Sequence, residues 1–147
     1  MSIERIPIIT LWQPWATWIS LGWKTIETRT HPRFKGLMGK RIGIHAGARW
    51  DQDAFDTAEQ YLSDEQLLQT KEYYRLRKGI VCTAMVQDFR KLTVADSTAA
   101  LIECRSTRWG LVLADVLVPE VPVPANGRQG IWFYPTEGRW TPIAQAA

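Results

Sequence analysis

Residues 12–29 read WQPWATWISLGWKTIETR and hold four of the eight tryptophans. Pro14 suits the first turn of a helix, the apolar side chains that follow recur at helical spacing, and Gly22 is a natural stop. Alternation typical of a strand begins soon afterwards. We therefore predict a short helix over residues 13–21 and a strand over residues 25–29.

The rest of the chain divides into short segments. Strands are favoured where apolar or alternating runs meet Gly and Pro breaks, and helices where apolar residues recur at helical spacing. The predicted strands cover residues 6–10, 41–46, 80–86, 109–118 and 130–134, two helices lie between residues 51 and 78, and residues 92–105 stay unassigned. This order of elements lacks the alternation of strands and helices found in βαβ units. It predicts an α+β fold, namely a small, mostly antiparallel β-barrel with a short N-terminal helix and a helical pair inserted between strands.

Composition indicates one compact domain over residues 1–147. The sequence is 46% hydrophobic, has no apolar run of the roughly 18 residues that a membrane helix needs, and opens without an apolar signal core. We expect a soluble, cytoplasmic protein that does not contact a membrane. Cys82 and Cys104 have neither CxxC spacing nor a second pair, so we expect buried thiols rather than disulfide or zinc ligands.

Positive charge gathers in one part of the sequence. Residues 21–50 hold seven basic side chains and one acidic one, a local net charge of +6 in a chain whose formal net charge is +3. An anionic partner would gain Coulomb attraction and counterion release there, and nucleic acid is the common polyanion of a cytoplasm. The alternative is a solvated basic loop without a ligand.

Three segments, in this order along the chain, resemble the signature of the ASCH domain, a PUA-like β-barrel. They read LWQPWA at residues 11–16, GWKTIETR at residues 22–29 and GKRIGIHA at residues 39–46. The resemblance covers most of the chain. It implies a barrel with a cleft over the Gln-Pro helix start and the Lys-x-x-Glu-x-Arg segment, and RNA or nucleoside ligands in that cleft.

The helix start offers chemistry that suits such a ligand. Pro14 in the first turn leaves backbone N–H groups and the positive end of the helix dipole near Gln13, a setting for a phosphate or a carbonyl oxygen. The Gln13 amide can donate and accept, as the reading of a base edge requires. Trp12 offers a flat face for stacking, whereas Trp15 and Trp18 are expected to anchor the helix in the core.

Charged and imidazole side chains complete the predicted binding site. On a regular strand Glu27 and Arg29 share a face and could pair, either in a ligand site or as a structural salt bridge. Lys24 either acts as a base with a lowered pKa or binds phosphate as a point charge. His45 ends a strand, where it contacts a ligand or makes a structural hydrogen bond. No Cys or acidic ligands accompany it at metal spacing, so we expect neither a metal nor a cofactor.

Some small members of the ASCH family look like amidohydrolases that remove the acyl group from acetylated cytidine. The resemblance implies a lysine, a threonine three residues later and a glutamate on a later strand. Lys24 matches the lysine, but Glu27 stands in the threonine position and the strand at residues 80–88 has no glutamate. In a variant mechanism, Lys24 or Glu27 activates water, and Thr28 or backbone N–H groups near Gln13 bind the oxyanion.

Three functions therefore stay open. The first is an RNA or modified-nucleoside binding domain with a basic, Trp-lined cleft, whose affinity falls with salt and on Arg29→Ala. The second is an amidohydrolase acting on acylated cytidine-type nucleosides, with Lys24 and Glu27 as the catalytic pair. The third is a protein-interaction domain that has kept the barrel without the ligand.

Overall fold

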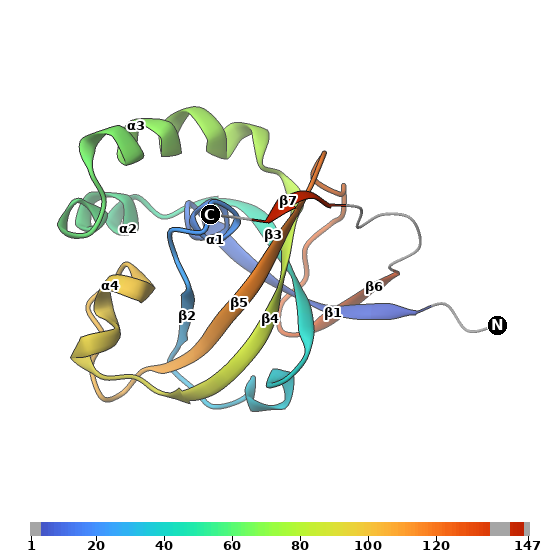
Figure 1. Ribbon diagram of the computed structural model, residues 1–147, viewed down its shortest axis with the longest axis horizontal. Helices are drawn as coiled ribbons and strands as arrows, with labels where there is room; N and C mark the ends of the chain where they lie inside the picture. Colours follow the sequence, from blue (N-terminus) through green and yellow to red (C-terminus); the bar gives the residue numbers. More distant parts are fainter. Residues whose placement is uncertain (1–3, 136–141, 146–147) are drawn as a thin grey trace.

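The computed structural model describes residues 4–135 and 142–145, and its central feature is one twisted sheet (Figure 1). The strands are β1 (Arg5–Gln13), β2 (Ile26–Arg29), β3 (Arg41–Trp50), β4 (Gly79–Lys91), β5 (Trp109–Pro119), β6 (Trp132–Pro135) and β7 (Pro142–Gln145). Their order is β2-β5-β4-β3-β1-β6, and β7 also pairs with β5. Only β1 and β3 run parallel, so the predicted antiparallel character is confirmed.

The sheet is open, so the prediction of a barrel is wrong. β2 and β6 form its two ends, and among the described residues no strand pairing joins them. Closing a barrel requires the two end strands to meet along a shared ladder. Here each has only four residues, and they pair with β5 and β1 respectively. Figure 1 shows the other strands of the sheet between them.

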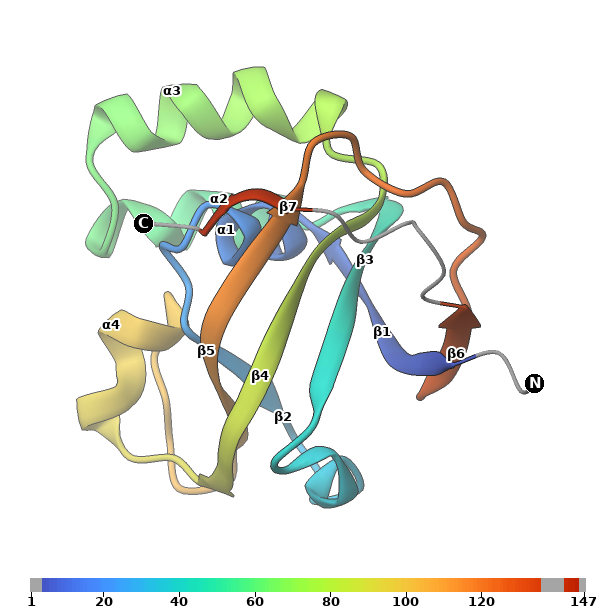
Figure 2. The same ribbon diagram turned by 45° about the vertical axis from the view of Figure 1, so that its right-hand side comes forward.

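Helices cover one end of this sheet. The predicted N-terminal helix is α1 (Trp15–Ser20), and the predicted helical pair is α2 (Gln52–Thr57) and α3 (Asp64–Tyr73), inserted between β3 and β4. In Figures 1 and 2, α3 lies across α2 and α1. Within the described part of the chain, no helix is long and apolar enough to cross a membrane. The remaining helical segments are α4 (Ser97–Ala100) and the 3₁₀ turns η1 (Lys35–Leu37), η2 (Ala58–Gln60), η3 (Tyr74–Leu76) and η4 (Val94–Asp96).

Several elements differ from their predicted bounds. β1 continues to Gln13, so this residue ends a strand, and Pro14 takes the N-cap position of α1. β3 and β4 both run several residues beyond their predicted ends, because each is paired on both sides and the neighbouring strands extend the ladder. The unassigned residues 92–105 contain η4 and α4, and β7 lies outside every predicted strand.

The core fixes α1 against the sheet and the other helices. Trp18 is fully buried, and its Nε1–H donates to Thr70 Oγ1 of α3 at 2.9 Å. Trp15 packs edge-on against Trp18, with ring centroids 5.2 Å apart. Both tryptophans anchor the helix, as predicted. Cys82 and Cys104 are free and buried, also as predicted, and burial raises the pKa of Cys82 to about 12.

Candidate ligand-binding cleft

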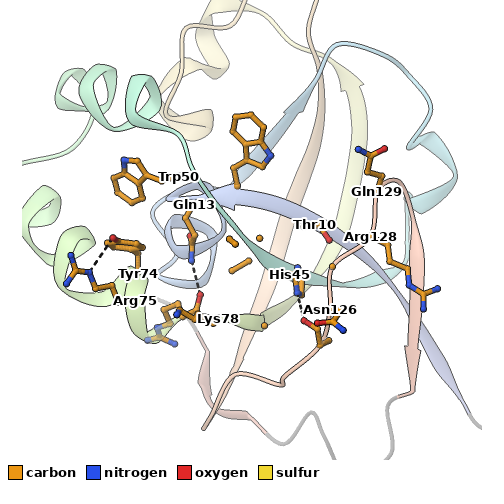
Figure 3. Close-up of a pocket in the computed structure, with 18 residues that line it drawn as sticks. Thr10, Gln13, His45, Trp50, Tyr74, Arg75, Lys78, Asn126, Arg128 and Gln129 are labelled. Atoms are coloured by element: carbon orange, nitrogen blue, oxygen red, sulfur yellow. Dashed lines mark hydrogen bonds between the residues drawn. The ribbon is translucent and has the colours of Figure 1, made fainter.

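A cleft of about 850 Å³ opens beside the C-terminal parts of β1 and β3 (Figure 3). Its floor carries Thr10 and Gln13 from β1 and His45 from β3. One wall, the η3 wall, is formed by residues 74–79, where η3 leads into β4. The opposite wall is the loop of residues 125–129. Figure 3 shows the two walls on opposite sides of this floor, with Tyr74 and Lys78 on one side and Asn126 and Gln129 on the other.

A backbone bridge joins the two walls next to the cleft. The Ile80 N–H donates to the Val123 carbonyl at 2.8 Å, and the Val123 N–H donates to the Ile80 carbonyl at 3.0 Å. Gly79 permits this approach, because its φ is +84° and a Cβ there would collide with the Val123 carbonyl oxygen. The sequence turns at a glycine here because no larger residue fits.

The cleft has a positive lining. Arg75, Arg77 and Lys78 line it from the η3 wall and Arg128 from the opposite wall, and no Asp or Glu is among the described residues that line it. Positively charged side chains around a concave surface raise the local concentration of anions. The sequence signal for the η3 wall is the run RLRK at residues 75–78, which helical spacing places at the end of the predicted helical pair.

Aromatic rings lie beside these cations. Trp12 lines the cleft with 46% of its surface exposed, and the Arg49 guanidinium lies 4.6 Å from its ring centroid. Trp50 and Tyr74 also line the cleft, with their ring centroids 4.6 Å apart. An exposed ring offers a face on which a base can stack. Trp50 and Tyr74 had no predicted role, because Trp50 lies between the predicted strand at residues 41–46 and the helical pair, and Tyr74 lies within that pair.

Gln13 borders the cleft, but its side-chain amide is already hydrogen-bonded to backbone groups of the protein. Oε1 accepts the backbone N–H of Thr17 at 2.9 Å, and Nε2 donates to the backbone oxygen of Arg77 at 2.8 Å. The first bond satisfies an N–H group in the first turn of α1, where an anion was predicted to bind. The second ties the floor to the η3 wall. Pro14 is buried and does not line the cleft.

His45 lies in the floor with 5% of its surface exposed. Its Nε2 is 2.8 Å from the carbonyl oxygen of Ala125, which ties the floor to the 125–129 wall. Its Nδ1 is buried and has no hydrogen-bond partner among the described residues. Burial lowers the pKa of His45, and the bond to Ala125 opposes that shift. The structural hydrogen bond foreseen for His45 therefore uses one ring nitrogen only.

Lys24, Glu27 and Arg29 form a separate cluster that does not line this cleft. Lys24 is 1% exposed, and its Nζ donates to the Ala100 carbonyl oxygen at 2.6 Å. The same Nζ lies 3.7 Å from Glu27 Oε1 and 4.5 Å from the centroid of the Trp15 ring. Arg29 Nη2 lies 3.4 Å from Glu27 Oε2, the pairing predicted from their shared strand face.

Burial shifts the protonation equilibrium of Lys24 in this cluster. Desolvation lowers the pKa of Lys24 from 10.5 to about 8, and the Glu27 carboxylate opposes the shift because it favours the ammonium form. The lowered pKa agrees with one of the two roles predicted for Lys24. Of the predicted site residues, Trp12, Gln13 and His45 lie at the cleft and the three charged residues lie in a mostly buried cluster, while Pro14 is buried and belongs to neither group.

No protein-family model and no curated protein sequence matches the chain. Among solved structures, that of ASCH from Zymomonas mobilis matches with a TM-score of 0.54 at 15% identity, over 89% of this chain and 88% of that one. A tyrosine-to-phenylalanine mutant of that protein matches with a TM-score of 0.51 at 14% identity, over 91% of this chain and 93% of that one. The chain has an ASCH-like fold.

The ASCH-like fold confirms, at the level of architecture, the resemblance carried by the three sequence motifs. The motif at residues 11–16 joins β1 to α1 and reaches the cleft floor. The end of the motif at residues 39–46, in β3, also reaches the cleft. The motif at residues 22–29 forms β2 and the charged cluster. The resemblance implied one cleft over the first two motifs, whereas here only the first of these two borders the cleft.

Proposed function

We propose that the cleft binds RNA through unpaired nucleotides, or a modified nucleoside of RNA. The observation that carries this proposal is that four cations and three aromatic rings surround one cleft whose described lining has no carboxylate. Cations bind phosphate groups with release of counterions, and aromatic rings stack on bases at about 1–3 kcal/mol per base. The two kinds of side chain match the two parts of a nucleotide.

The size of the cleft favours unpaired nucleotides over a duplex. Its volume of about 850 Å³ lies within the roughly 300–1,000 Å³ of pockets that enclose a small ligand. In a duplex the bases stack on one another and pair, whereas the bases of a single strand are free to enter a cleft and stack on protein rings. Trp12, with nearly half of its surface exposed, is the most accessible of the rings.

Two exposed lysines allow a matched test of this location. Lys78 lines the cleft, whereas Lys35 lies in the basic segment at residues 21–50 and away from the cleft. We expect Lys78→Ala to weaken binding of a short single-stranded RNA about fivefold to tenfold, because one phosphate contact is lost, and Lys35→Ala to leave it nearly unchanged. Fluorescence anisotropy of labelled RNA measures both affinities.

Three outcomes would contradict the proposal. RNA binding that is lost in Lys35→Ala and kept in Lys78→Ala would move the site to the basic segment. Binding that does not respond to salt would exclude phosphate recognition as its basis. No binding of RNA or nucleosides at all would favour the protein-interaction alternative.

Hydrolysis of an acylated nucleoside is the second candidate, and the lowered pKa of Lys24 is the observation that favours it. An amine with a pKa of about 8 can act as a base near neutral pH. However, its ammonium is hydrogen-bonded to Ala100 inside the protein and does not line the cleft. We therefore rank binding of RNA or a nucleoside above hydrolysis of an acylated nucleoside. Release of cytidine from acetylated cytidine by the wild type, lost in Lys24→Met, would reverse this order.

A further inference from the structure

Two polar side chains in the cleft floor lie side by side on neighbouring strands. Thr10 of β1 and His45 of β3 are direct partners in the parallel ladder, so their side chains lie on the same face of the sheet. Both line the cleft. The ring of Trp132 packs edge-on against His45, with centroids 5.5 Å apart, and holds the imidazole in place.

The hydrogen bonds of His45 fix where its proton lies. The Ala125 carbonyl oxygen 2.8 Å from Nε2 can only accept, so Nε2 carries the hydrogen. In the neutral ring Nδ1 is then an acceptor, and it is the nitrogen without a partner among the described residues. Leaving a buried acceptor unpaired costs about 1–3 kcal/mol. A ligand that donates a hydrogen bond to Nδ1 would recover this free energy.

Thr10 supplies a hydroxyl group on the neighbouring strand. The indole Nε1–H of Trp132 donates to Thr10 Oγ1 at 3.1 Å, so the hydroxyl oxygen already accepts one bond. In the side-chain hydrogen bonds of the described residues the Thr10 hydroxyl acts only as an acceptor, so its hydrogen is free to donate. The floor therefore presents a donor and an acceptor on adjacent strands.

We infer that Thr10 and His45 read the hydrogen-bonding edge of one unpaired base, with His45 Nδ1 accepting from an N–H group and the Thr10 hydroxyl donating to the ring nitrogen or carbonyl beside it. Adenine fits this pair through its 6-amino group and the adjacent ring nitrogen. The inference rests on the proposed function, and it names the part of the cleft that recognises the base rather than the phosphate.

The backbone at Gly127, in the 125–129 wall, lies close to the unpaired nitrogen. A Cβ at Gly127 would lie 2.8 Å from His45 Nδ1 and 2.7 Å from its Cε1. The base therefore reaches Nδ1 by displacing the middle of an exposed loop that has no secondary structure. The ends of that wall stay tied through Ala125 and the bridge at Val123.

The test compares two RNA probes that differ by one group. One is a short oligoadenylate, and the other has purine riboside in place of adenosine, so it lacks the 6-amino group but keeps the ring and the phosphates. We expect the wild type to bind the oligoadenylate about tenfold more tightly, because only this probe satisfies Nδ1. In His45→Phe the two affinities are expected to agree within about twofold, while the salt dependence stays.

Thr10→Val is the second variant, because it keeps the side-chain shape and removes only the hydroxyl. It should weaken oligoadenylate binding about fivefold, and circular dichroism checks that both variants are folded. Equal binding of the two probes by the wild type would overturn the role of His45 and leave RNA binding in the cleft intact. Failure of both probes to bind would overturn the inference and the proposed function together.

Discussion

Lys24 brings an ammonium group into the interior, where its pKa is about 8 against an ordinary value of 10.5. Between these values the unfolded chain keeps the proton and the folded chain releases it, so the free energy of unfolding rises with pH. Relative to Lys24→Met, the wild type should gain about 2 kcal/mol between about pH 7.5 and about pH 10. Urea denaturation of both proteins across this range measures the difference.

The exposed Lys35 provides the control for this pH dependence. Lys35→Met should give the same change of stability with pH as the wild type, because the Lys35 side chain is exposed to solvent in the folded protein. A difference between wild type and Lys24→Met that stays constant across the pH range would contradict a buried ammonium.

Residue-level prediction from sequence succeeded where local geometry decides. The pairing of Glu27 and Arg29 follows from the two-residue period of a strand. The direction of the Lys24 side chain could not be predicted from that period, because Lys24 precedes the strand. Its side chain points toward Ala100, 76 positions further along the chain. Gln13 was expected to read a ligand, but the course of the chain brings the Arg77 carbonyl to it, which no local pattern indicates.

At the scale of elements, one hydrogen bond joins α1 to α3. Thr70→Val keeps the shape of the Thr70 side chain but leaves the buried Trp18 Nε1–H without its acceptor. We expect the free energy of unfolding to fall by about 1–3 kcal/mol, the cost of an unpaired buried donor. Chemical denaturation measures this loss.

Thr57→Val in α2 makes the same chemical change at an exposed position. The Thr57 hydroxyl donates only to carbonyls of its own helix, so its loss should alter stability by less than about 0.5 kcal/mol. Equal effects of the two substitutions would mean that the bond between α1 and α3 does not hold these helices together.

Element types were readable from the sequence because periodicity and Gly or Pro breaks act locally. The short helix, the helical pair and the central strand β4 all follow from such patterns. The prediction of a barrel was wrong. Closure depends on whether β2 and β6 meet, and these strands are far apart in the chain. α4, with four residues, is too short to show helical periodicity.

At the scale of the whole molecule, folding redistributes the positive charge. The segment at residues 21–50 carries a local charge of +6, but Lys24 is buried, and Arg29 and Arg41 pair with Glu27 and Asp115. The cations at the cleft come instead from later parts of the chain. The sequence indicated an anionic partner for residues 21–50, whereas the proposed cleft takes its four lining cations from residues 75–128, because pairing and burial are tertiary properties.

The charge around the cleft predicts the salt dependence of RNA binding. If each of the four lining cations contacts a phosphate of a single strand, the slope of log affinity against log salt is about −3. Arg128→Ala removes one cation from the 125–129 wall and should make the slope shallower by about 0.7. Titrations at several salt concentrations measure both slopes, and an unchanged slope in Arg128→Ala would exclude that wall from phosphate binding.

The bridge between Ile80 and Val123 has a consequence for the entropy of binding. Together with the bonds from Gln13 and His45, it holds the ends of both walls before any ligand arrives. A preorganised surface loses little conformational freedom on binding, so most of the gross interaction energy appears as affinity. Only the part of the loop around Gly127 has to reorder. Differences in affinity between ligands should therefore reflect mainly the shape and charge of each ligand, with little contribution from changes in protein conformation.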